Sequence, residues 1–445
     1  MQISPILERF RQYSGDAQIM RIYEKAASLQ GLRVLHINTT ARGGGVAEIL
    51  SALTPITNTL GITHARKVIQ LDEASGALMG HLVDLLQNHD EPGAMPERDV
   101  QIFLEKLSHS LIRTPELDAD IYVIHDFQLV PLAQLFSWLQ PAFWFCHVDT
   151  AHPNPHGVQY VRQFLDDYEL AVFNTSASVL QDLPLEKRQV INLGIDPFVD
   201  KNQAMDRTEG IERIRRCGLD PERPLLTQVA RFGRWKDPWQ AVDIYRLVKV
   251  QEPHVQLALV GAMEASDDHT AMEVLQSVKR YVGEDPDVHF LYDPQRIGNR
   301  EVNAFQRFSN VVLQRSQREG FGLTATEAMW KYQPIIGTSS TGLRSQIIHE
   351  ENGYIADDVG ASAFYALHLL HHPEIKDQLG DRAHAYVQQH HLLPGMLEDY
   401  LDSLLHICQR CEVRRHGIQA NPESMESATK HESSQRERIA DGATD

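Results

Sequence analysis

The chain has 445 residues and carries 60 acidic side chains against 42 basic ones, which gives a formal net charge of −18 at pH 7. Its hydrophobic fraction of 42% is ordinary for a chain that buries real cores and too high for a largely disordered one. A strongly acidic surface repels the phosphates of nucleic acids and anionic lipids, so the charge argues against a duplex-binding protein. An anionic substrate would therefore need a local basic cluster.

The sequence shows no sign of export or membrane insertion. The first 23 residues mix charged with apolar side chains and lack the apolar core of a signal peptide, and no stretch approaches ~18 uninterrupted apolar residues. The four cysteines, Cys146, Cys217, Cys408 and Cys411, are too few for a disulfide scaffold. We therefore expect a cytoplasmic protein with no membrane anchor and no nucleic-acid partner.

Short apolar runs alternate with helical patterns through the first part of the chain. Strands are expected at residues 32–38, 121–126, 142–149, 170–174 and 188–192. A glycine run at residues 43–45 follows the first strand, and apolar residues then recur at helical spacing from Val46 to Ile56. A further helix is expected at residues 157–168. Near-continuous apolar strands separated by helices indicate a parallel sheet covered on both faces.

A second cycle follows residue 192. Strands are expected at residues 225–230, 255–260, 288–291, 311–313 and 334–337, and helices at 239–250, 302–308 and 324–332. The turn-rich residues 193–197 would form the hinge between the two cycles. The sequence therefore predicts an α/β protein with two Rossmann-like, doubly wound domains, residues 1–193 and 194–395, facing across a cleft.

The end of the chain differs in composition. Residues 396–411 are expected to form a C-terminal helix. This helix could cross back to the N-terminal domain. Residues 412–445 are polar and nearly free of large apolar side chains. We expect them to form a disordered tail.

The glycine run lies where a strand ends and a helix begins. Backbone N–H groups and the positive end of the helix dipole point outward there, and glycine lets a phosphate or a sugar hydroxyl approach closely. The run from Thr40 to Gly45 is neither a dinucleotide fingerprint nor a P-loop, so neither a nicotinamide cofactor nor a Walker-type ATP site is supported. The alternative is a tight turn with no ligand.

Arg231 and Lys236 follow the predicted strand at 225–230. Two cations at the carboxyl end of a strand, in an acidic protein, form the local basic cluster that an anionic substrate needs. A diphosphate requires about that much positive charge where no metal is present. The alternative is a solvated basic loop.

Glu319 and Glu327 bracket the sequence Gly-Phe-Gly-Leu-Thr-Ala-Thr. Glu319 would lie in a loop and Glu327 inside a helix, and Phe321-Gly322 would expose amides at the helix start. A carboxylate at this place can accept hydrogen bonds from sugar hydroxyls while the amides hold phosphate. Two surface carboxylates without function are the alternative, which the glycine context disfavours.

These motifs together resemble the retaining glycosyltransferases of family 4, whose E-x7-E signature matches Glu319 to Glu327. The resemblance covers about residues 31–411. Within that group, residues 36–48, the segments Cys146-His147-Val148-Asp149 and Trp235-Lys236-Asp237-Pro238, and residues 302–307 and 326–331 resemble the trehalose synthases that transfer glucose from a nucleotide donor. The retaining trehalose phosphorylases share much of this pattern. The resemblance implies a GT-B fold, with the donor held by the C-terminal domain and the acceptor by the N-terminal domain.

The resemblance also implies roles for single residues. Arg231 and Lys236 would hold the diphosphate, and Glu327 would hold ribose hydroxyls. The donor hexose would be held by the segment Glu319, Gly320, Phe321, Gly322 and Leu323.

On the other domain, Gly44 and Gly45 would close over the donor. His147 would lie near the donor sugar, and Asp126, Gln128 and Asp149 would line the acceptor side. The residues expected to take part directly in catalysis are Glu319, His147, Asp126, Arg231 and Lys236.

The acceptor segments depart from the family pattern. Phe127 and Leu129 stand where the family usually has proline, and Thr150 to Pro153 replace a different run. Three functions therefore stay open besides trehalose synthesis from nucleotide-glucose and glucose. They are a retaining trehalose phosphorylase, a family 4 enzyme with another small acceptor, and an inactive sugar-binding protein.

No essential cofactor or metal is expected, although Mg²⁺ could accompany the donor diphosphate. Asp118-Ala119-Asp120 looks like a metal-binding D-x-D but precedes a strand instead of following one. The nucleotide base is not readable, because base contacts would come from backbone and from loops such as residues 262–268. A homodimer is also left open.

Overall fold

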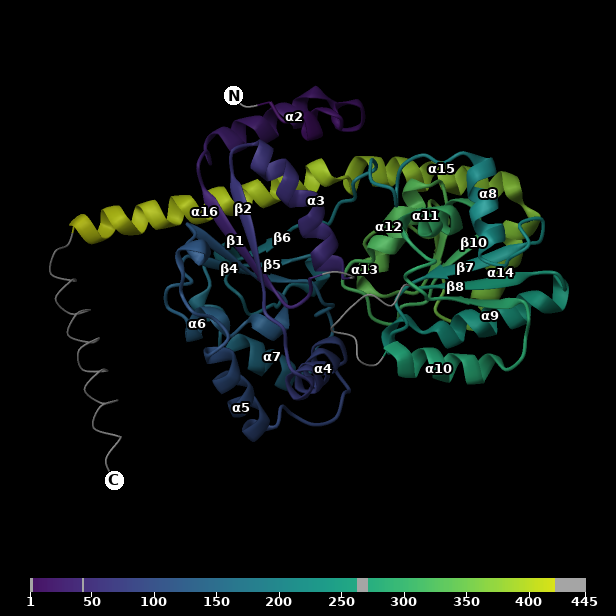
Figure 1. Cartoon of the computed structure of the whole chain (residues 1–445), viewed down its shortest axis with the longest axis horizontal. Helices are drawn as coiled ribbons and strands as arrows, with labels where there is room; N and C mark the ends of the chain where they lie inside the picture. Colours follow the sequence, from purple (N-terminus) through teal and green to yellow (C-terminus); the bar gives the residue numbers. More distant parts are fainter. Residues whose placement is uncertain (1–2, 42–43, 262–270, 421–445) are drawn as a thin grey trace.

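The computed structural model describes residues 3–41, 44–261 and 271–420, with side chains as far as Cys411. Gly43 and the loop at residues 262–268 lie outside the described residues. Two α/β domains lie next to each other along the longest axis of the molecule (Figure 1).

The N-terminal domain is built on a parallel sheet with the strand order β2-β1-β3-β4-β5-β6. Its strands are β1 (Arg33–Asn38), β2 (Thr63–Val68), β3 (Ile121–His125), β4 (Ala142–Cys146), β5 (Leu170–Phe173) and β6 (Arg188–Val190). One face is covered by helices α1 (Pro5–Glu8), α2 (Arg11–Ala27) and α3 (Gly45–Thr59). The other is covered by α4 (Glu73–Gln87), α5 (Glu97–Ser108), α6 (Leu132–Leu135) and α7 (Pro155–Arg162).

The C-terminal domain repeats this plan with the parallel strand order β12-β11-β10-β7-β8-β9. Its strands are β7 (Leu225–Val229), β8 (Gln256–Val260), β9 (Val288–Leu291), β10 (Val311–Gln314), β11 (Ile335–Gly337) and β12 (Gly353–Ile355). Helices α9 (Pro238–Gln251), α10 (Ala271–Val282) and α14 (Val359–His371) share one core. The remaining helices are α8 (Arg207–Arg216), α11 (Asn299–Phe308), α12 (Leu323–Trp330), α13 (Thr341–Arg344) and α15 (Pro373–His390).

The predicted fold of two doubly wound domains is confirmed, with one more strand in each sheet than we expected. β3, β4, β7 and β8 are buried along their whole length, as strands covered on both faces should be. The two unpredicted strands are β2 and β12. β2 is a partly exposed edge strand with polar residues, and β12 has three residues, so neither presents a buried apolar run.

The chain crosses between the domains twice, and the two crossings are tied together. Ile195 N donates to His391 O at 2.9 Å, and Leu393 N donates to Ile195 O at 2.9 Å. Helix α16 (Leu393–Ala420) then runs back along the N-terminal domain, shown in yellow in Figure 1. Its residues Leu397, Leu401 and Leu404 share a core with α2 and α3.

The end of α16 corrects one expectation. We predicted a helix at 396–411 followed by a disordered tail from 412, but the helix continues to Ala420, and residues 421–445 lie outside the described residues. The segment after Cys411 contains no proline, and adding residues to an established helix costs little.

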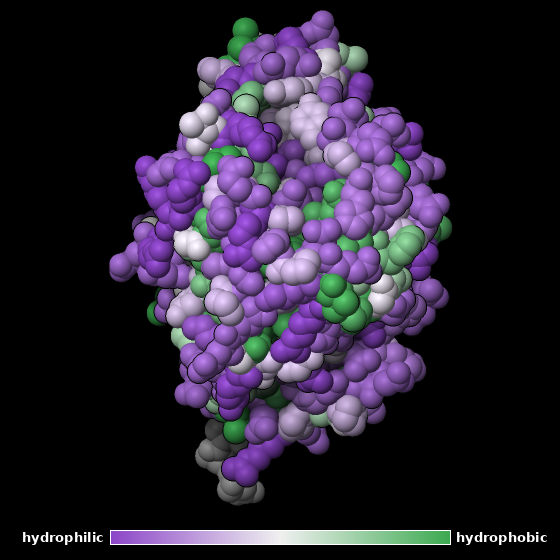
Figure 2. All heavy atoms as spheres, turned by 90° about the vertical axis from the view of Figure 1, so that its right-hand side faces the viewer, coloured by the Kyte–Doolittle hydropathy of each residue, from purple (hydrophilic) through white to green (hydrophobic). Residues whose placement is uncertain are grey.

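The surface fits the composition. Polar residues dominate the end of the molecule formed by the C-terminal domain, with apolar groups scattered among them (Figure 2). No helix within the described residues combines the length and hydrophobicity that crossing a membrane requires.

Candidate active site

The predicted site residues come together because of the sheet topology. In each sheet the strand order reverses at one point, between β1 and β3 in the N-terminal domain and between β7 and β10 in the C-terminal domain. Ligands of doubly wound sheets bind outside the carboxyl ends of the strands at such points. The glycine loop follows β1, Asp126 follows β3, Arg231 and Lys236 follow β7, and Glu319 follows β10.

The glycine loop ends at the start of α3. Gly44 is the N-cap residue, with extended backbone (φ −137°, ψ 158°), and Gly45 is the first helical residue. A Cβ on Gly45 would meet nothing within 4 Å, so this helix start is open to a ligand. The helix dipole and the backbone amides of a helix start favour an anion or a polar group there.

The loop after β7 brings a cation to the site. Lys236 lies in a short 3-10 helix, η6 (Arg234–Lys236), and its Nζ pairs with a carboxylate oxygen of Glu319. Ser316 Oγ donates to the same oxygen at 2.9 Å. Arg231 is exposed just beyond the end of β7. The residues that would bind diphosphate and hexose thus meet directly.

An open hollow adjoins this loop on the C-terminal domain. It is lined by Arg234, Asp237 and Gln317 from the β7 and β10 loops, with Trp239 and Tyr281 at its apolar side. Trp235 points the other way, and its Nε1 donates to Asp84 Oδ1 of α4 at 2.9 Å. Burial raises the pKa of Asp84, against the effect of this hydrogen bond. The contact joins the two domains next to Lys236.

Glycines allow the loop before α12 to fit between the domains. Gly322 is the N-cap of α12 and has a left-handed backbone (φ 94°), which suits glycine. A Cβ on Gly320 would lie 2.1 Å from the backbone oxygen of His147 in the other domain. Gly342 N donates to Glu319 O at 2.8 Å and fixes the loop from the C-terminal side. The predicted placement of Glu319 in a loop and Glu327 in a helix is confirmed.

Glu327 is more enclosed than its expected role suggests. Its side chain is 1% exposed, and it accepts an ion pair from Lys201 Nζ at 2.8 Å and a hydrogen bond from Gln306 Nε2 at 3.1 Å. Burial raises the pKa of Glu327, while Lys201 opposes that effect. For Glu327 to hold ribose hydroxyls, it would have to share or exchange these partners.

Lys201 is a site residue that sequence reasoning missed. Its Nζ also contacts Glu48 Oε1 at 2.7 Å, so it joins the first turn of α3 to the E-x7-E helix. Although burial works against the charged form, the carboxylates of Glu327 and Glu48 raise the pKa of Lys201. It lies in an irregular linker, where no periodic pattern or motif marks it.

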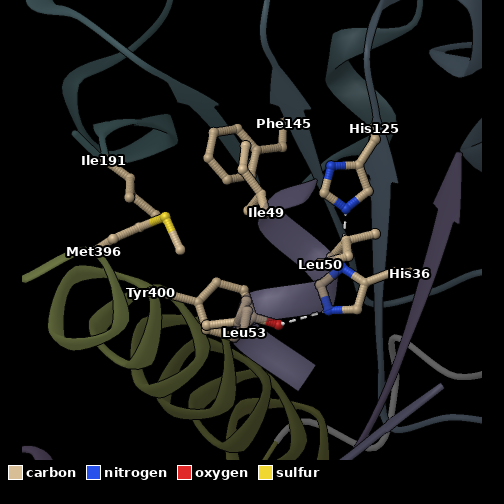
Figure 3. Close-up of a pocket in the computed structure, with 9 residues that line it drawn as sticks. All are labelled: His36, Ile49, Leu50, Leu53, His125, Phe145, Ile191, Met396 and Tyr400. Atoms are coloured by element: carbon tan, nitrogen blue, oxygen red, sulfur yellow. Dashed lines mark hydrogen bonds between the residues drawn. The ribbon is translucent and has the colours of Figure 1, made fainter. Parts of the chain in front are cut away.

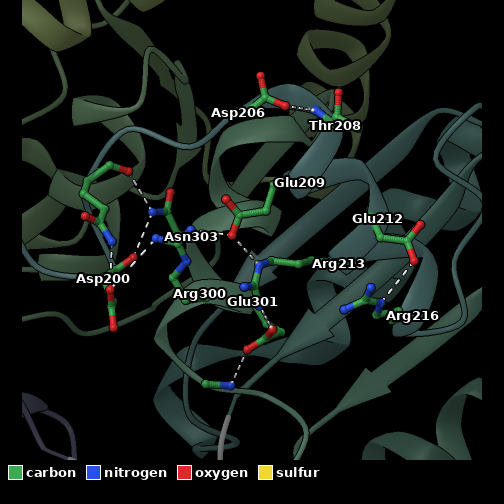
Figure 4. Close-up of polar contacts among 12 residues, drawn as sticks. Asp200, Asp206, Thr208, Glu209, Glu212, Arg213, Arg216, Arg300, Glu301 and Asn303 are labelled. Carbon is green, nitrogen blue, oxygen red and sulfur yellow. Dashed lines mark hydrogen bonds and ion pairs between the residues drawn. The ribbon is translucent and has the colours of Figure 1, made fainter.

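Polar contacts hold the Lys201 linker against α11. Asn303 Nδ2 donates to the backbone oxygens of Asp200 and Gln203, each at 2.9 Å (Figure 4). Ion pairs of Arg213 with Glu301 and of Arg300 with Glu209 tie α8 to α11 beside it. Lys201 is therefore held in place in two ways. Asn303 fixes the backbone around it, and the carboxylates of Glu48 and Glu327 pair with its side chain.

The N-terminal domain contributes Asp126 and His147. Asp126 has a positive φ of 63°, a strained backbone for a non-glycine residue of the kind often found at functional sites. Its Oδ1 accepts from the backbone N of His147 at 3.1 Å, which sets the start of the β4 loop. His147 is partly exposed at the end of β4.

The other two acceptor-side residues differ in surroundings. Asp149 is 3% exposed, and burial raises its pKa, against the effects of Thr341 and Arg318 from the other domain. Gln128 follows β3 in a 3-10 helix, and its buried Oε1 has no hydrogen-bond partner within the described chain. Both lie at the carboxyl ends of β3 and β4.

The described residues contain no group of three or more side chains arranged to hold a metal. The aspartates of the D-x-D sequence are engaged elsewhere, Asp118 with Arg113 at 3.0 Å and Asp120 with Arg33 at 3.1 Å.

Comparison with known proteins agrees with this geometry. Residues 36–179 match the family described as trehalose synthase, N-terminal domain, and residues 211–385 match glycosyl transferases group 1. The trehalose synthase of Thermococcus litoralis is 36% identical over 398 residues, covering 89% of this chain and 96% of that protein. The trehalose phosphorylase of Pleurotus pulmonarius is 30% identical over 222 residues, 43% of this chain and 30% of that protein.

Among solved structures, an α,α-trehalose 6-phosphate synthase from Burkholderia multivorans superposes with a TM-score of 0.65. It is 15% identical in sequence, and the match covers 87% of this chain and 100% of that one. The fold of this chain and the loops at the switch points of its two sheets therefore identify it as a GT-B glycosyltransferase. The chain belongs to the trehalose synthase family within glycosyl transferases group 1.

Proposed function

We propose that this protein transfers glucose from a nucleotide-glucose donor to glucose, with retention of anomeric configuration, and so forms trehalose. The observation that carries the proposal is the contact between Lys236 and Glu319 at the switch point of the C-terminal sheet. It brings a cation for a leaving diphosphate next to a carboxylate for sugar hydroxyls. The near full-length similarity to trehalose synthases supports the choice of product.

The chemistry follows from where charge develops. Retention proceeds either by two displacements through a carboxylate nucleophile or by departure and attack on the same face, and both pass through an oxocarbenium-like transition state. Negative charge then grows on the departing diphosphate, and Arg231 and Lys236 stabilise it more in the transition state than in the ground state.

The remaining donor contacts come from both domains. The amides from Gly320 to Leu323 and the Glu319 carboxylate hold the hexose, and Glu327 holds the ribose. Gly44 and Gly45 supply amides from the opposite domain. Lys201 links that helix start to Glu327, so donor binding at Glu327 is coupled to the position of the glycine loop.

The acceptor is held by the N-terminal domain. Asp126, Gln128 and Asp149 line the acceptor side, and His147 lies near the donor sugar. No metal or cofactor takes part in the proposed step, although Mg²⁺ can accompany the donor diphosphate. The partners are small molecules, and nucleic acid is disfavoured by the net charge of −18.

One experiment tests the proposal. The protein is incubated with ADP-, UDP- and GDP-glucose and a panel of sugar acceptors, and products are identified by mass and by the anomeric signals in NMR. Trehalose from one nucleotide-glucose and glucose is the expected result. A product with inverted linkage, or no transfer from any donor, would contradict it.

A retaining trehalose phosphorylase is the second candidate, favoured by the similarity to the Pleurotus enzyme over 222 residues. Inorganic phosphate would then occupy the place of the donor diphosphate beside Lys236. Incubation of trehalose with labelled phosphate separates the two functions, since only a phosphorylase forms labelled glucose 1-phosphate.

A further inference from the structure

A continuous line of hydrogen bonds runs from His147 into the core of the N-terminal domain. His147 Nε2 lies 3.0 Å from His125 Nδ1, and His125 Nε2 lies 2.9 Å from His36 Nδ1. His36 Nε2 lies 3.2 Å from the Tyr400 hydroxyl, which lies 2.9 Å from His64 Nε2. Figure 3 shows the central part, in which Tyr400 of α16 and His125 of β3 both contact His36 of β1. We call these five side chains the histidine relay.

The relay is shut off from solvent except at the active-site end. His36, His125, His64 and Tyr400 are each at most 6% exposed, whereas His147 is partly exposed at the carboxyl end of β4. Apolar side chains such as Leu50, Phe145 and Met396 surround the central members (Figure 3). Charged imidazoles are costly in such a place, so every ring should carry one proton and act as one donor and one acceptor.

The inner end of the relay determines the direction of its hydrogen bonds. His64 Nδ1 lies 3.2 Å from the backbone oxygen of Ile62, which can only accept, so Nδ1 carries the proton. His64 Nε2 must then accept from the Tyr400 hydroxyl, whose oxygen in turn accepts from His36 Nε2. His36 Nδ1 is then unprotonated and accepts from His125 Nε2. His125 Nδ1 in turn accepts from His147 Nε2, so the proton of His147 lies on Nε2.

The outer end favours the same direction, through two longer contacts. Asn174 Nδ2 lies 3.4 Å from His147 Nδ1 and 3.5 Å from the backbone oxygen of His147. A backbone oxygen can only accept, so the Asn174 amide must present its N–H groups there, and His147 Nδ1 must be an acceptor. The two ends, which lie on different elements, agree on one arrangement of protons.

We propose that His36, His125, Tyr400 and His64 are positioning residues that hold His147 as the neutral tautomer protonated at Nε2, with an unprotonated Nδ1. The relay cannot conduct a proton to solvent, since it ends on the buried carbonyl of Ile62. It acts as a tautomer lock, and a substrate hydroxyl that takes the place of Asn174 Nδ2 at His147 Nδ1 must donate. That last consequence rests on the proposed function. The lock also gives the return of α16 a role, since α16 supplies Tyr400.

The pKa values of the relay histidines are all lowered, which agrees with neutral rings. Burial, with smaller effects of neighbouring histidines and Arg66, lowers the pKa values of His36 and His125. Burial also lowers the pKa of His147 to about 3 and that of His64 to about 4. The four rings are therefore neutral at pH 7.

The test reads tautomers directly on the full chain without substrate. Long-range ¹H–¹⁵N spectra of ¹⁵N-histidine-labelled protein distinguish Nδ1–H, Nε2–H and charged rings, with each signal assigned by its loss in a single His→Gln variant. We expect Nε2–H for His36, His125 and His147, and Nδ1–H for His64. A charged ring or an Nδ1–H tautomer at His147 would overturn the proposal, whether or not the protein makes trehalose.

Tyr400→Phe removes only the central hydroxyl. We expect His64 to keep its tautomer while His36, His125 and His147 gain Nδ1–H populations, with a fall of about tenfold in kcat, the scale of one lost hydrogen bond. Tyr168→Phe is the matched control, because its buried hydroxyl donates to Val130 O at 2.8 Å in the same domain outside the relay. Unchanged tautomers in Tyr400→Phe, or equal changes in both variants, would refute the lock.

Discussion

Replacing Gly320 with alanine tests how closely the two domains must meet. The new Cβ would lie 2.1 Å from the backbone oxygen of His147 and 3.1 Å from its carbonyl carbon. A relaxed carbon–oxygen contact is about 3.3 Å, so against the 2.1 Å of this structure the loop or the whole domain must retreat by about 1.2 Å. Both sides of the contact are backbone, and no side-chain rotation can relieve it.

The cost should appear in catalysis more than in folding. Gly320 follows Glu319, so a retreat of this size moves the carboxylate that we propose for hexose binding away from His147 and Asp126. A misplacement of ~1 Å can reduce the rate about 100-fold, or roughly 2.7 kcal/mol in the barrier. Each domain keeps its own core, so we expect the melting temperature to change by only a few degrees.

The assay is trehalose formation at saturating donor, with nucleoside diphosphate affinity measured by calorimetry. Gly80→Ala is the matched control, since a Cβ there would meet nothing within 4 Å and the residue lies in helix α4. A Gly320→Ala variant that keeps the wild-type kcat would show that the close approach of the domains does not govern the reaction. A fall in kcat in Gly80→Ala would point to a general effect of substitution.

Three further predictions follow from the site. Lys236→Ala should lower kcat by 10²–10³-fold, about 2.7–4 kcal/mol, with little change in acceptor KM, as for a lost oxyanion contact; an unchanged kcat would contradict the diphosphate role. Lys201→Met should lower the unfolding free energy by about 3–5 kcal/mol, because it leaves the buried Glu327 carboxylate without its ion pair. Adding Glu327→Gln should restore most of that loss in denaturant titrations, and no recovery would count against the ion pair. The pKa of His64, about 4 when folded, lies below the ordinary value. The folded state then binds fewer protons, so stability should fall as pH drops below about 6.5, by up to ~1.4 kcal/mol per pH unit for this ring. His64→Gln should remove that part of the slope, and an identical slope would refute the assignment.

Much of the fold and part of the site could be predicted from the sequence. Strands buried on both faces are apolar along their length, so they stand out, and residues that follow them lie at one edge of the sheet. In this way the sequence predicts Arg231 and Lys236 at the carboxyl end of a strand and Glu319 in a loop. The edge strand β2 and the three-residue β12 were missed because partial exposure and short length remove the signal.

Other features depend on tertiary structure that no local pattern encodes. Lys201 lies in an irregular linker and reaches two carboxylates far away in the sequence. The histidine relay joins residues from β1, β2, β3 and α16 with the residue that follows β4, and its order exists only after the parallel sheet has formed. The continuation of α16 beyond residue 411 was missed because composition alone does not say where a packed helix stops.

Although the chain as a whole is acidic, the carboxylates at the site are paired with lysines of the same chain. In a protein of net charge −18, Lys236 pairs with Glu319 and Lys201 pairs with Glu327 and Glu48. Each carboxylate of the E-x7-E pair thus already has a cation from the same chain. Under the proposed function, a diphosphate that binds Lys236 would draw it from Glu319 and leave that carboxylate oxygen able to accept a hydroxyl of the same donor. Binding of the leaving group and of the hexose would then be linked by one exchange of partners, so we expect neither group alone to bind as well as the intact nucleotide-sugar.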